Sequence, residues 1–172
     1  MKHIITIFFI LLSLPAIAEK YCVFTPIKGT EGLGGNRVRN ITQLPDGRMM
    51  IITEGLLNLY DGTDFNYLHY NQKHFCPLSA YSGFHHEYID SHGYMWIKNQ
   101  YQLMAVDIKH ECLVEQPDSL LATWGISSPI KDFFMDKAKN IWIINDKDEL
   151  ILVDKNNMKV KTFLPYASST GN

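Results

Sequence analysis

The sequence repeats itself at a nearly constant interval, and this repeat limits the folds that the chain can adopt. The segments GRMMI, GYMWI and KNIWI begin at Gly47, Gly93 and Lys139, so the interval is 46 residues both times. Each copy closes with an aspartate, at intervals of 46 and then 47 residues, namely Asp61, Asp107 and Asp154. A fixed period in the forties, built from short strand-like segments, is typical of β-propellers, in which each repeat forms one four-stranded sheet, or blade.

Each copy divides into four short segments with the composition of β-strands, separated by turn residues. In the first copy the turns are Pro-Asp-Gly at 45–47, Gly55 and Asp-Gly at 61–62, and all three residue types favour turn conformations. The predicted strands are residues 38–44, 48–53, 56–60 and 65–69 in the first copy, 84–89, 95–99, 103–107 and 111–115 in the second, and 130–135, 141–145, 150–154 and 159–164 in the third. Helical periodicity is absent outside the first 18 residues, so no helix is predicted after them.

We therefore predict an all-β fold, a partial β-propeller of about three four-stranded antiparallel blades. The predicted blades are residues 38–83, 84–129 and 130–172, the last including the start of a missing next blade. Residues 19–37 hold an isolated strand at 21–24, predicted to close the ring as an outermost strand, and a Gly-rich loop. Even small propellers need about four blades, so the chain is expected to be the N-terminal part of a longer protein.

The first 18 residues have the pattern of a secretory signal peptide. Lys2 and His3 precede an apolar run at 4–17, and the run leads into Ala-Ile-Ala at 16–18, which is typical of a cleavage site. The run is shorter than the ~20 apolar residues of a membrane span, and no later segment is apolar for long enough. The mature protein is therefore expected in the periplasm, without insertion in the membrane.

Charge and cysteine content narrow the classes of function. The net charge is −2 and the basic residues are dispersed, which argues against nucleic-acid binding. The sequence has no nucleophile elbow, phosphate-binding loop or dinucleotide fingerprint, so neither catalysis nor a cofactor is predicted. The three cysteines, Cys22, Cys76 and Cys112, allow at most one intrachain disulfide, with three possible pairings, or serve as small buried thiols.

The residues that recur also match a known repeat. The first copy contains Gly47, Ile51, Thr53, Gly55-Leu56 and Tyr60-Asp61-Gly62, the second Asp90, Gly93, Trp96-Ile97 and Asp107, and the third Asp136, Trp142-Ile143 and Asp154. These residues resemble the two-component regulator propeller repeat, and residues 32–38 are similar to the usual entry into its first blade. Three residues depart from the family pattern: Met50 stands at a tryptophan position, and Ile52 and Lys139 stand at glycine positions. These departures concern packing and turns.

The resemblance implies a place in the extracytoplasmic sensor region of a hybrid two-component system, many of which sense glycans in gut bacteria. In that family large propellers are followed by an immunoglobulin-like domain, a membrane helix and a histidine kinase. This chain is similar to the N-terminal piece of such a sensor, truncated before the membrane helix and the kinase.

The residues that recur with the repeat are predicted to be structural. A tryptophan placed by the repeat packs between blades, and an aspartate copied once per blade is a turn residue, not one of a catalytic pair. The structural repeat positions are Gly47, Asp61, Gly93, Trp96, Asp107, Trp142 and Asp154.

Two places outside the repeated core are candidate ligand sites. Trp124 lies in the predicted loop between the second and third blades, where its ring can stack on a sugar or pack beneath the loop. Residues 69–92 concentrate histidine and aromatic side chains, among which Tyr81, His85 and His86 are candidate ligand contacts. Adjacent residues of a strand point to opposite faces, so His85 and His86 are not expected to bind one metal ion, and no metal site is predicted.

The favoured hypothesis is a periplasmic segment of a two-component sensor that binds an oligosaccharide and passes the signal to a kinase. Its expected partners are the oligosaccharide and either the rest of a longer sensor chain or a second copy of the chain. Two alternatives stay open. One is a secreted propeller enzyme of the lyase or glycosidase kind, and the other is a nonfunctional fragment or a protein-interaction scaffold with open strand edges.

Overall fold

The structure is a computed structural model that describes residues 26–27, 29, 32–127 and 129–164. The predicted signal peptide, the predicted closing strand at 21–24 and Cys22 lie outside these residues. The elements in chain order are β1 (Val38–Gln43), β2 (Met49–Thr53), β3 (Leu56–Tyr60), β4 (Phe65–His69), the 3-10 helix η2 (Gln72–His74), β5 (Cys76–Pro77), β6 (His86–Ile89), β7 (Tyr94–Lys98), β8 (Gln102–Asp107), β9 (Cys112–Leu113), α2 (Pro117–Thr123), β10 (Ile130–Met135), β11 (Ile141–Asn145), β12 (Leu150–Val153) and β13 (Val160–Phe163).

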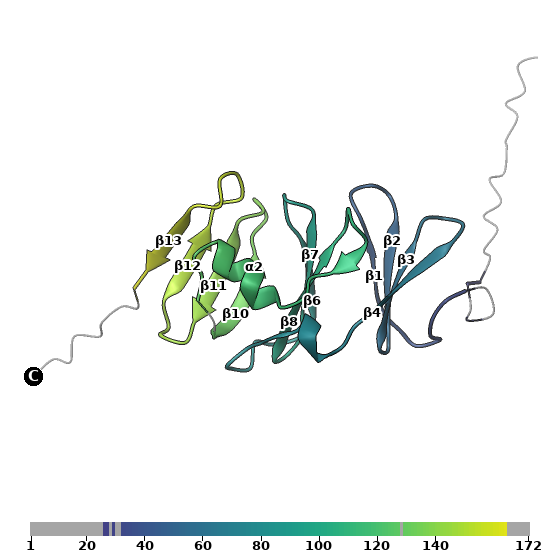
Figure 1. Cartoon of the computed structure of the whole chain (residues 1–172), viewed down its shortest axis with the longest axis horizontal. Helices are drawn as coiled ribbons and strands as arrows, with labels where there is room; N and C mark the ends of the chain where they lie inside the picture. Colours follow the sequence, from purple (N-terminus) through teal and green to yellow (C-terminus); the bar gives the residue numbers. More distant parts are fainter. Residues whose placement is uncertain (1–25, 28, 30–31, 128, 165–172) are drawn as a thin grey trace, which may run out of the picture.

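The strands form three antiparallel sheets that follow one another along the chain. β1 to β4 make the first sheet and β10 to β13 the third, each in up-and-down order, while the second has the order β5-β8-β7-β6 with β9 also paired to β8. The three sheets stand side by side in chain order (Figure 1). The prediction of an all-β fold with three antiparallel sheets in a partial, propeller-like array is therefore confirmed.

The second sheet differs from the predicted pattern at its outer edge. The predicted strand at 111–115 is reduced to β9, and β5 fills the rest of the β8 edge by pairing with Gln102 and Leu103. The chain leaves the sheet at Gln116, which has a φ of 58°, and Pro117 then begins α2. The prediction of no helix was wrong, because seven helical residues with one fully buried leucine, Leu121, are too few to show a helical period.

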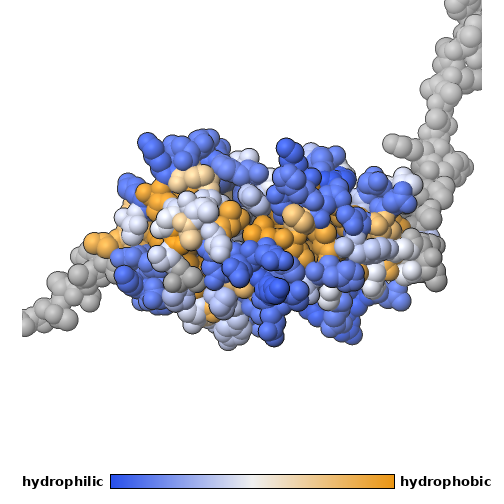
Figure 2. Space-filling model, viewed as in Figure 1, coloured by the Kyte–Doolittle hydropathy of each residue, from blue (hydrophilic) through white to orange (hydrophobic). Residues whose placement is uncertain are grey.

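Two apolar cores lie between neighbouring sheets. The core between the first and second sheets includes Met50, Ile52, Leu57, Leu59, Met95, Ile97, Met104 and Val106. The core between the second and third sheets includes Trp96, Leu103, Ala105, Leu121, Ile126, Phe133, Ile141, Ile143, Ile151 and Val153. The second sheet is thus covered on both faces, which explains the continuous apolar runs of β7 and β8. In the space-filling view apolar side chains form a band at mid-height along the row of sheets, with more polar side chains above and below it (Figure 2).

A carboxylate closes the first hairpin of the second and third sheets. Asp90 accepts hydrogen bonds from the Tyr94 backbone N–H at 2.9 Å and from Trp96 Nε1 at 2.8 Å. At the equivalent position Asp136 accepts from the Asn140 N–H at 2.9 Å and from Trp142 Nε1 at 3.0 Å. The repeated aspartate and tryptophan therefore act as a pair, since the carboxylate satisfies both the turn and the indole N–H.

The first sheet replaces this pair by two apolar residues. Leu44 occupies the position of Asp90, Met50 occupies that of Trp96, and both are buried. The turn keeps its carboxylate two residues later, where Asp46 accepts from the Arg48 N–H at 3.1 Å. Met50, a departure from the repeat pattern, is thus matched by a second departure at Leu44.

The Gly-rich loop covers the free face of the first sheet. Asn58 is fully buried there, donates to the Ile51 carbonyl at 2.9 Å and accepts from the Gly34 N–H at 2.8 Å. A Cβ on Gly34 would overlap the Leu56 Cδ2 atom and lie 2.7 Å from Asn58 Oδ1. Glycine is therefore required for close approach of the loop to the sheet.

We expect Gly34→Ala to lower the free energy of unfolding by about 1–3 kcal/mol, because the added methyl group overpacks this contact. Gly35→Ala is the matched control, since its Cβ would lie 3.2 Å from Thr53 Cβ and needs only a small adjustment. Urea unfolding of the two variants measures both costs. Equal losses would contradict the steric explanation.

Candidate functional site

The long connections of the fold gather at one end of the sheets. Because the strands are antiparallel, the β2–β3 and β7–β8 turns lie at the same end as the connections that enter β6 and β10. These connections are residues 70–85 and 114–129, whereas the turns at the opposite end, such as 44–48 and 90–93, are short. We call this the loop end. Binding residues concentrate on such connections over a rigid scaffold, so the loop end is where a site is expected.

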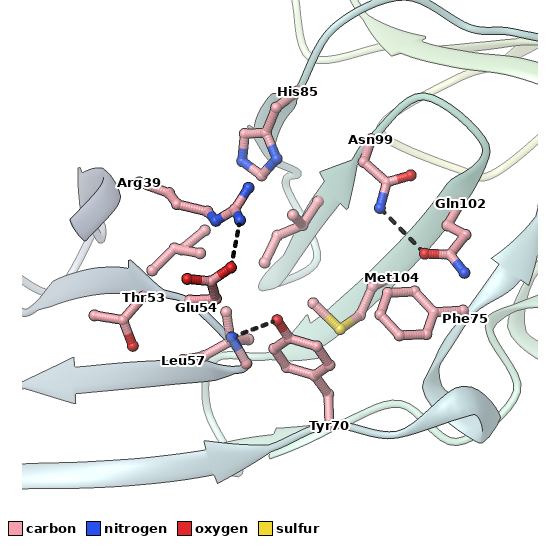
Figure 3. A pocket seen from close by; sticks show the side chains of 13 residues that line it. Arg39, Thr53, Glu54, Leu57, Tyr70, Phe75, His85, Asn99, Gln102 and Met104 are labelled. Atoms are coloured by element: carbon pink, nitrogen blue, oxygen red, sulfur yellow. Dashed lines mark hydrogen bonds and ion pairs between the residues drawn. The ribbon is translucent and has the colours of Figure 1, made fainter. Parts of the chain in front are cut away.

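A pocket of about 280 Å³ opens at the loop end between the first and second sheets (Figure 3). Its volume is near the lower limit of small-molecule sites, which run from about 300 to 1,000 Å³. The lining divides into an apolar floor of Ile52, Leu57, Ile97 and Met104, aromatic walls of Tyr70 and Phe75, and a polar rim that includes Arg39, Glu54, His85, Asn99 and Gln102. An apolar floor with a few convergent polar groups is the usual lining of a ligand site.

The polar rim is held by weak contacts that a ligand can replace. Arg39 pairs with Glu54 at 3.2 Å, and both side chains are more than half exposed. Exposed ion pairs contribute about 0–1 kcal/mol, so exchange of this pair for a ligand costs little. Asn99 Nδ2 donates to Gln102 Oε1 at 3.2 Å within the β7–β8 turn.

Glu87 lies behind the rim and joins the first two sheets. Its side chain is 5% exposed, and it bonds to His85 Nε2 at 2.9 Å and to the hydroxyl of Thr42 on β1. Burial raises the pKa of this carboxyl, but the hydrogen bonds from His85, Thr42 and Asn40 outweigh burial and leave the pKa below its ordinary value of 4.5. Glu87 is therefore ionised at neutral pH and fixes His85 at the pocket mouth.

The lowered pKa of Glu87 predicts acid sensitivity. A carboxyl whose pKa falls on folding contributes stability above its ordinary value of 4.5, and this stability is lost as the pH falls through the lower folded-state pKa. We expect Glu87→Gln to cost about 1–3 kcal/mol at pH 7 and to weaken the loss of stability on acidification. Urea unfolding at pH 7 and at about pH 3.5 measures this difference. An unchanged pH dependence would assign the acid sensitivity to other carboxyls.

The structure separates the predicted ligand contacts. His85 lies at the pocket rim, and Tyr81 lies on the neighbouring connection, with its ring 5.8 Å from that of Tyr101. His86 faces the third sheet and stacks on Tyr88 at 6.0 Å, so the two adjacent histidines point to opposite faces. Trp124 is the residue that follows α2. Its ring is partly buried and packs against Trp96 at 5.5 Å, at the edge of the core between the second and third sheets.

Several pocket residues lie inside the repeat and were missed. Arg39 belongs to β1, and Asn99 and Gln102 flank the β7–β8 turn. One feature of the sequence could have pointed to the β7–β8 turn. Tyr101 occupies the repeat position of Gly55, so an aromatic side chain replaces a turn glycine where the second copy departs from the first.

The recurring aspartates bind their own turns. Asp61 accepts from the Thr63 N–H at 2.7 Å and the Asp64 N–H at 2.8 Å, and these bonds lower its pKa. Asp107 accepts from the His110 N–H at 3.0 Å, and Asp154 accepts from the Asn156 N–H at 2.8 Å. Side chains used in this way have the geometry of Asx turns. Within the described residues no group of three His, Cys, Asp or Glu side chains is arranged to hold a metal ion.

The register of the second sheet excludes one of the three disulfide pairings. Cys76 is buried opposite Leu103, and Cys112 is exposed opposite Asp107. Four residues of strand separate these β8 positions by about 13 Å. This distance exceeds the roughly 7 Å between Cα atoms that a disulfide can bridge, so Cys76 and Cys112 do not pair.

The fold and the pocket define a class: a repeat protein of antiparallel sheets with a ligand-sized pocket between two of them. No known family model and no curated protein matches the chain. In the described part of the chain no helix reaches the length and apolarity that a bilayer span requires.

Solved structures with some similarity are known. One is described as the extracellular domain of the one-component system BT4673 from B. thetaiotaomicron, with 16% identity over 76% of this chain, 19% of the other chain and a TM-score of 0.40. Another is described as the extracellular domain of the hybrid two-component system BT3049 from B. thetaiotaomicron, with 21% identity over 81% of this chain, 20% of the other chain and a TM-score of 0.46. This chain therefore spans about a fifth of the length of each.

Proposed function

We propose that this chain is the ligand-binding segment of a periplasmic sensor, and that its ligand is an oligosaccharide held at the loop end of the first two sheets. The observation that carries the proposal is the pocket between those sheets, where an apolar floor lies beneath a rim of amide and charged side chains. A sugar ring offers apolar C–H faces and hydroxyl groups around its edge. The apolar floor and the polar rim match these two features.

The rim favours an uncharged ligand. Arg39 faces Glu54 at 3.2 Å, and His85 faces Glu87 at 2.9 Å. An anionic ligand would have to compete with both carboxylates, which carry the same sign of charge as the ligand. The amide side chains at the β7–β8 turn keep further donor and acceptor capacity for hydroxyl groups. We therefore propose a neutral oligosaccharide.

The sensor role and the periplasmic location rest on the sequence pattern. The repeats resemble those of sensor propellers, and residues 1–18 have the pattern of a cleavable signal. Fractionation of cells that express the full chain tests the location. We expect release with the periplasm and a mature N-terminus at Glu19, whereas an uncleaved cytoplasmic protein would contradict the proposal.

Isothermal titration of the full chain with neutral trisaccharides tests the ligand class. The probes are maltotriose, cellotriose, xylotriose, mannotriose and arabinotriose, and we expect at least one to bind. Arg39→Ala and Gln102→Ala should each weaken its binding by about tenfold, the effect of losing one hydrogen bond of about 1.4 kcal/mol. Binding of none of the probes at millimolar concentration would overturn the proposal.

Arg37→Ala is the matched control for Arg39→Ala. Arg37 carries the same charge and pairs with the same residue, Glu54, at 3.5 Å, but it does not line the pocket. We expect binding by this variant to match the unsubstituted protein. Equal losses for the two arginine variants would show that net charge, and not the pocket, governs the affinity.

A further inference from the structure

Three exposed aromatic side chains lie beside the pocket. Phe84 is 75% exposed, and Tyr81 and Tyr101 are each 55% exposed. Single exposed apolar residues are ordinary, but a group of exposed aromatic rings next to a pocket marks a contact surface. We call these three residues the aromatic platform.

Two of the three rings of the platform are held in place by contacts within the protein. The rings of Tyr81 and Tyr101 contact each other edge to face, with centroids 5.8 Å apart and planes at 69°. Their backbones are joined because the Leu78 N–H donates to the Tyr101 carbonyl at 2.7 Å and the Ser82 N–H donates to the Gln100 carbonyl at 2.9 Å. Ordered side chains cost less entropy on binding, so these rings are ready to stack on a ligand.

The pocket and the platform form one continuous surface. Arg39, His85, Asn99 and Gln102 line the pocket and also line the neighbouring depression that contains Phe84 and Tyr101. Both recesses lie at the loop end and share these four polar side chains. A linear ligand that fills the pocket therefore extends across the shared rim onto the platform.

We propose that the aromatic platform is a second subsite, which stacks on the next sugar unit of an oligosaccharide whose first unit occupies the pocket. This inference rests on the proposed function and deepens it, because it makes two units the shortest ligand that fills both subsites. Tyr81 and Tyr101 meet at a wide angle, so one ring can lie flat against a sugar face while the other meets its edge. Asn99 and Gln102 at the junction bind the hydroxyl groups between the two units.

The second subsite is tested by titration of the full chain with the mono-, di- and trisaccharide of each of the five series named above. We expect affinity to rise at least tenfold from one unit to two, which corresponds to stacking on one aromatic platform. Tyr81→Ala and Phe84→Ala should each lose most of this gain and leave monosaccharide affinity unchanged. Tyr101→Phe should retain the gain, because it keeps the ring.

Phe163→Ala is the matched control, since Phe163 is 37% exposed on β13 and lies in neither recess. Near-ultraviolet circular dichroism of each variant checks that the fold is retained. Monosaccharide binding without a gain for longer ligands, or a gain that survives in Tyr81→Ala and Phe84→Ala, would overturn the second subsite alone. Failure of sugars of every length to bind would overturn the proposed function and the subsite together.

Discussion

Replacing Asp132 with alanine is expected to lower the free energy of unfolding by about 2–3 kcal/mol, the cost of removing a hydrogen bond to a buried charged group. Lys98 of β7 has a side chain that is only 4% exposed, and its Nζ lies 2.7 Å from Oδ1 of Asp132 on β10, whose side chain is 34% exposed. The substitution leaves a buried ammonium group without its counter-charge. Lys98→Met instead removes the charge and keeps most of the side-chain volume, so we expect it to cost less than about 1.5 kcal/mol.

Urea unfolding of the full chain, followed by circular dichroism, measures both losses. Lys131→Met at the exposed pair Lys131–Asp148 is the matched control, and its cost should stay within about 1 kcal/mol. Equal losses for Asp132→Ala and Lys98→Met would contradict the explanation from burial. This ion pair matters for the candidate site because it joins the second and third sheets next to the turn that holds Asn99.

The fold could be predicted because the repeat fixes the spacing of strands and turns. A blade of this kind buries its middle strands against both neighbours, and the apolar runs at β7 and β8 reflect that burial in the sequence. The repeat interval gives no information about segments that are present in only one copy of the repeat. The short helix α2 and the strand β5 fall between the copies, and so the repeat could not predict them.

The sequence pointed to residues near the pocket only where the local composition was unusual. Tyr81 and His85 belong to the segment rich in aromatic and histidine side chains, and both lie at the loop end. Arg39 and Gln102 are ordinary strand and turn residues whose importance depends on two sheets meeting. Trp124 stood outside the repeated core for a structural reason, since α2 places its ring against Trp96.

The second large prediction comes from comparing the second sheet, which has Asp90 and Trp96, with the first, which has Leu44 and Met50 at the same positions. Asp90→Leu, which copies Leu44 of the first sheet, is expected to lower the free energy of unfolding by about 3 kcal/mol. Trp96 is fully buried, and its Nε1 would lose the acceptor that now lies 2.8 Å away. Water cannot replace that acceptor at a position without exposed surface.

The double substitution Asp90→Leu with Trp96→Met copies both apolar residues of the first sheet. Methionine has no N–H to leave unpaired, so the double variant should lose about 1–2 kcal/mol less than the sum of the two single losses. Asp136→Leu is the matched control, because Trp142 is only partly buried and water can reach its indole, so a smaller loss is expected. Chemical denaturation of the four variants gives the coupling directly. Strictly additive losses would assign the cost of Asp90→Leu to the His92 and Tyr94 backbone N–H groups of the turn. The Leu44 and Met50 pair of the first sheet would then not be explained by the missing indole N–H.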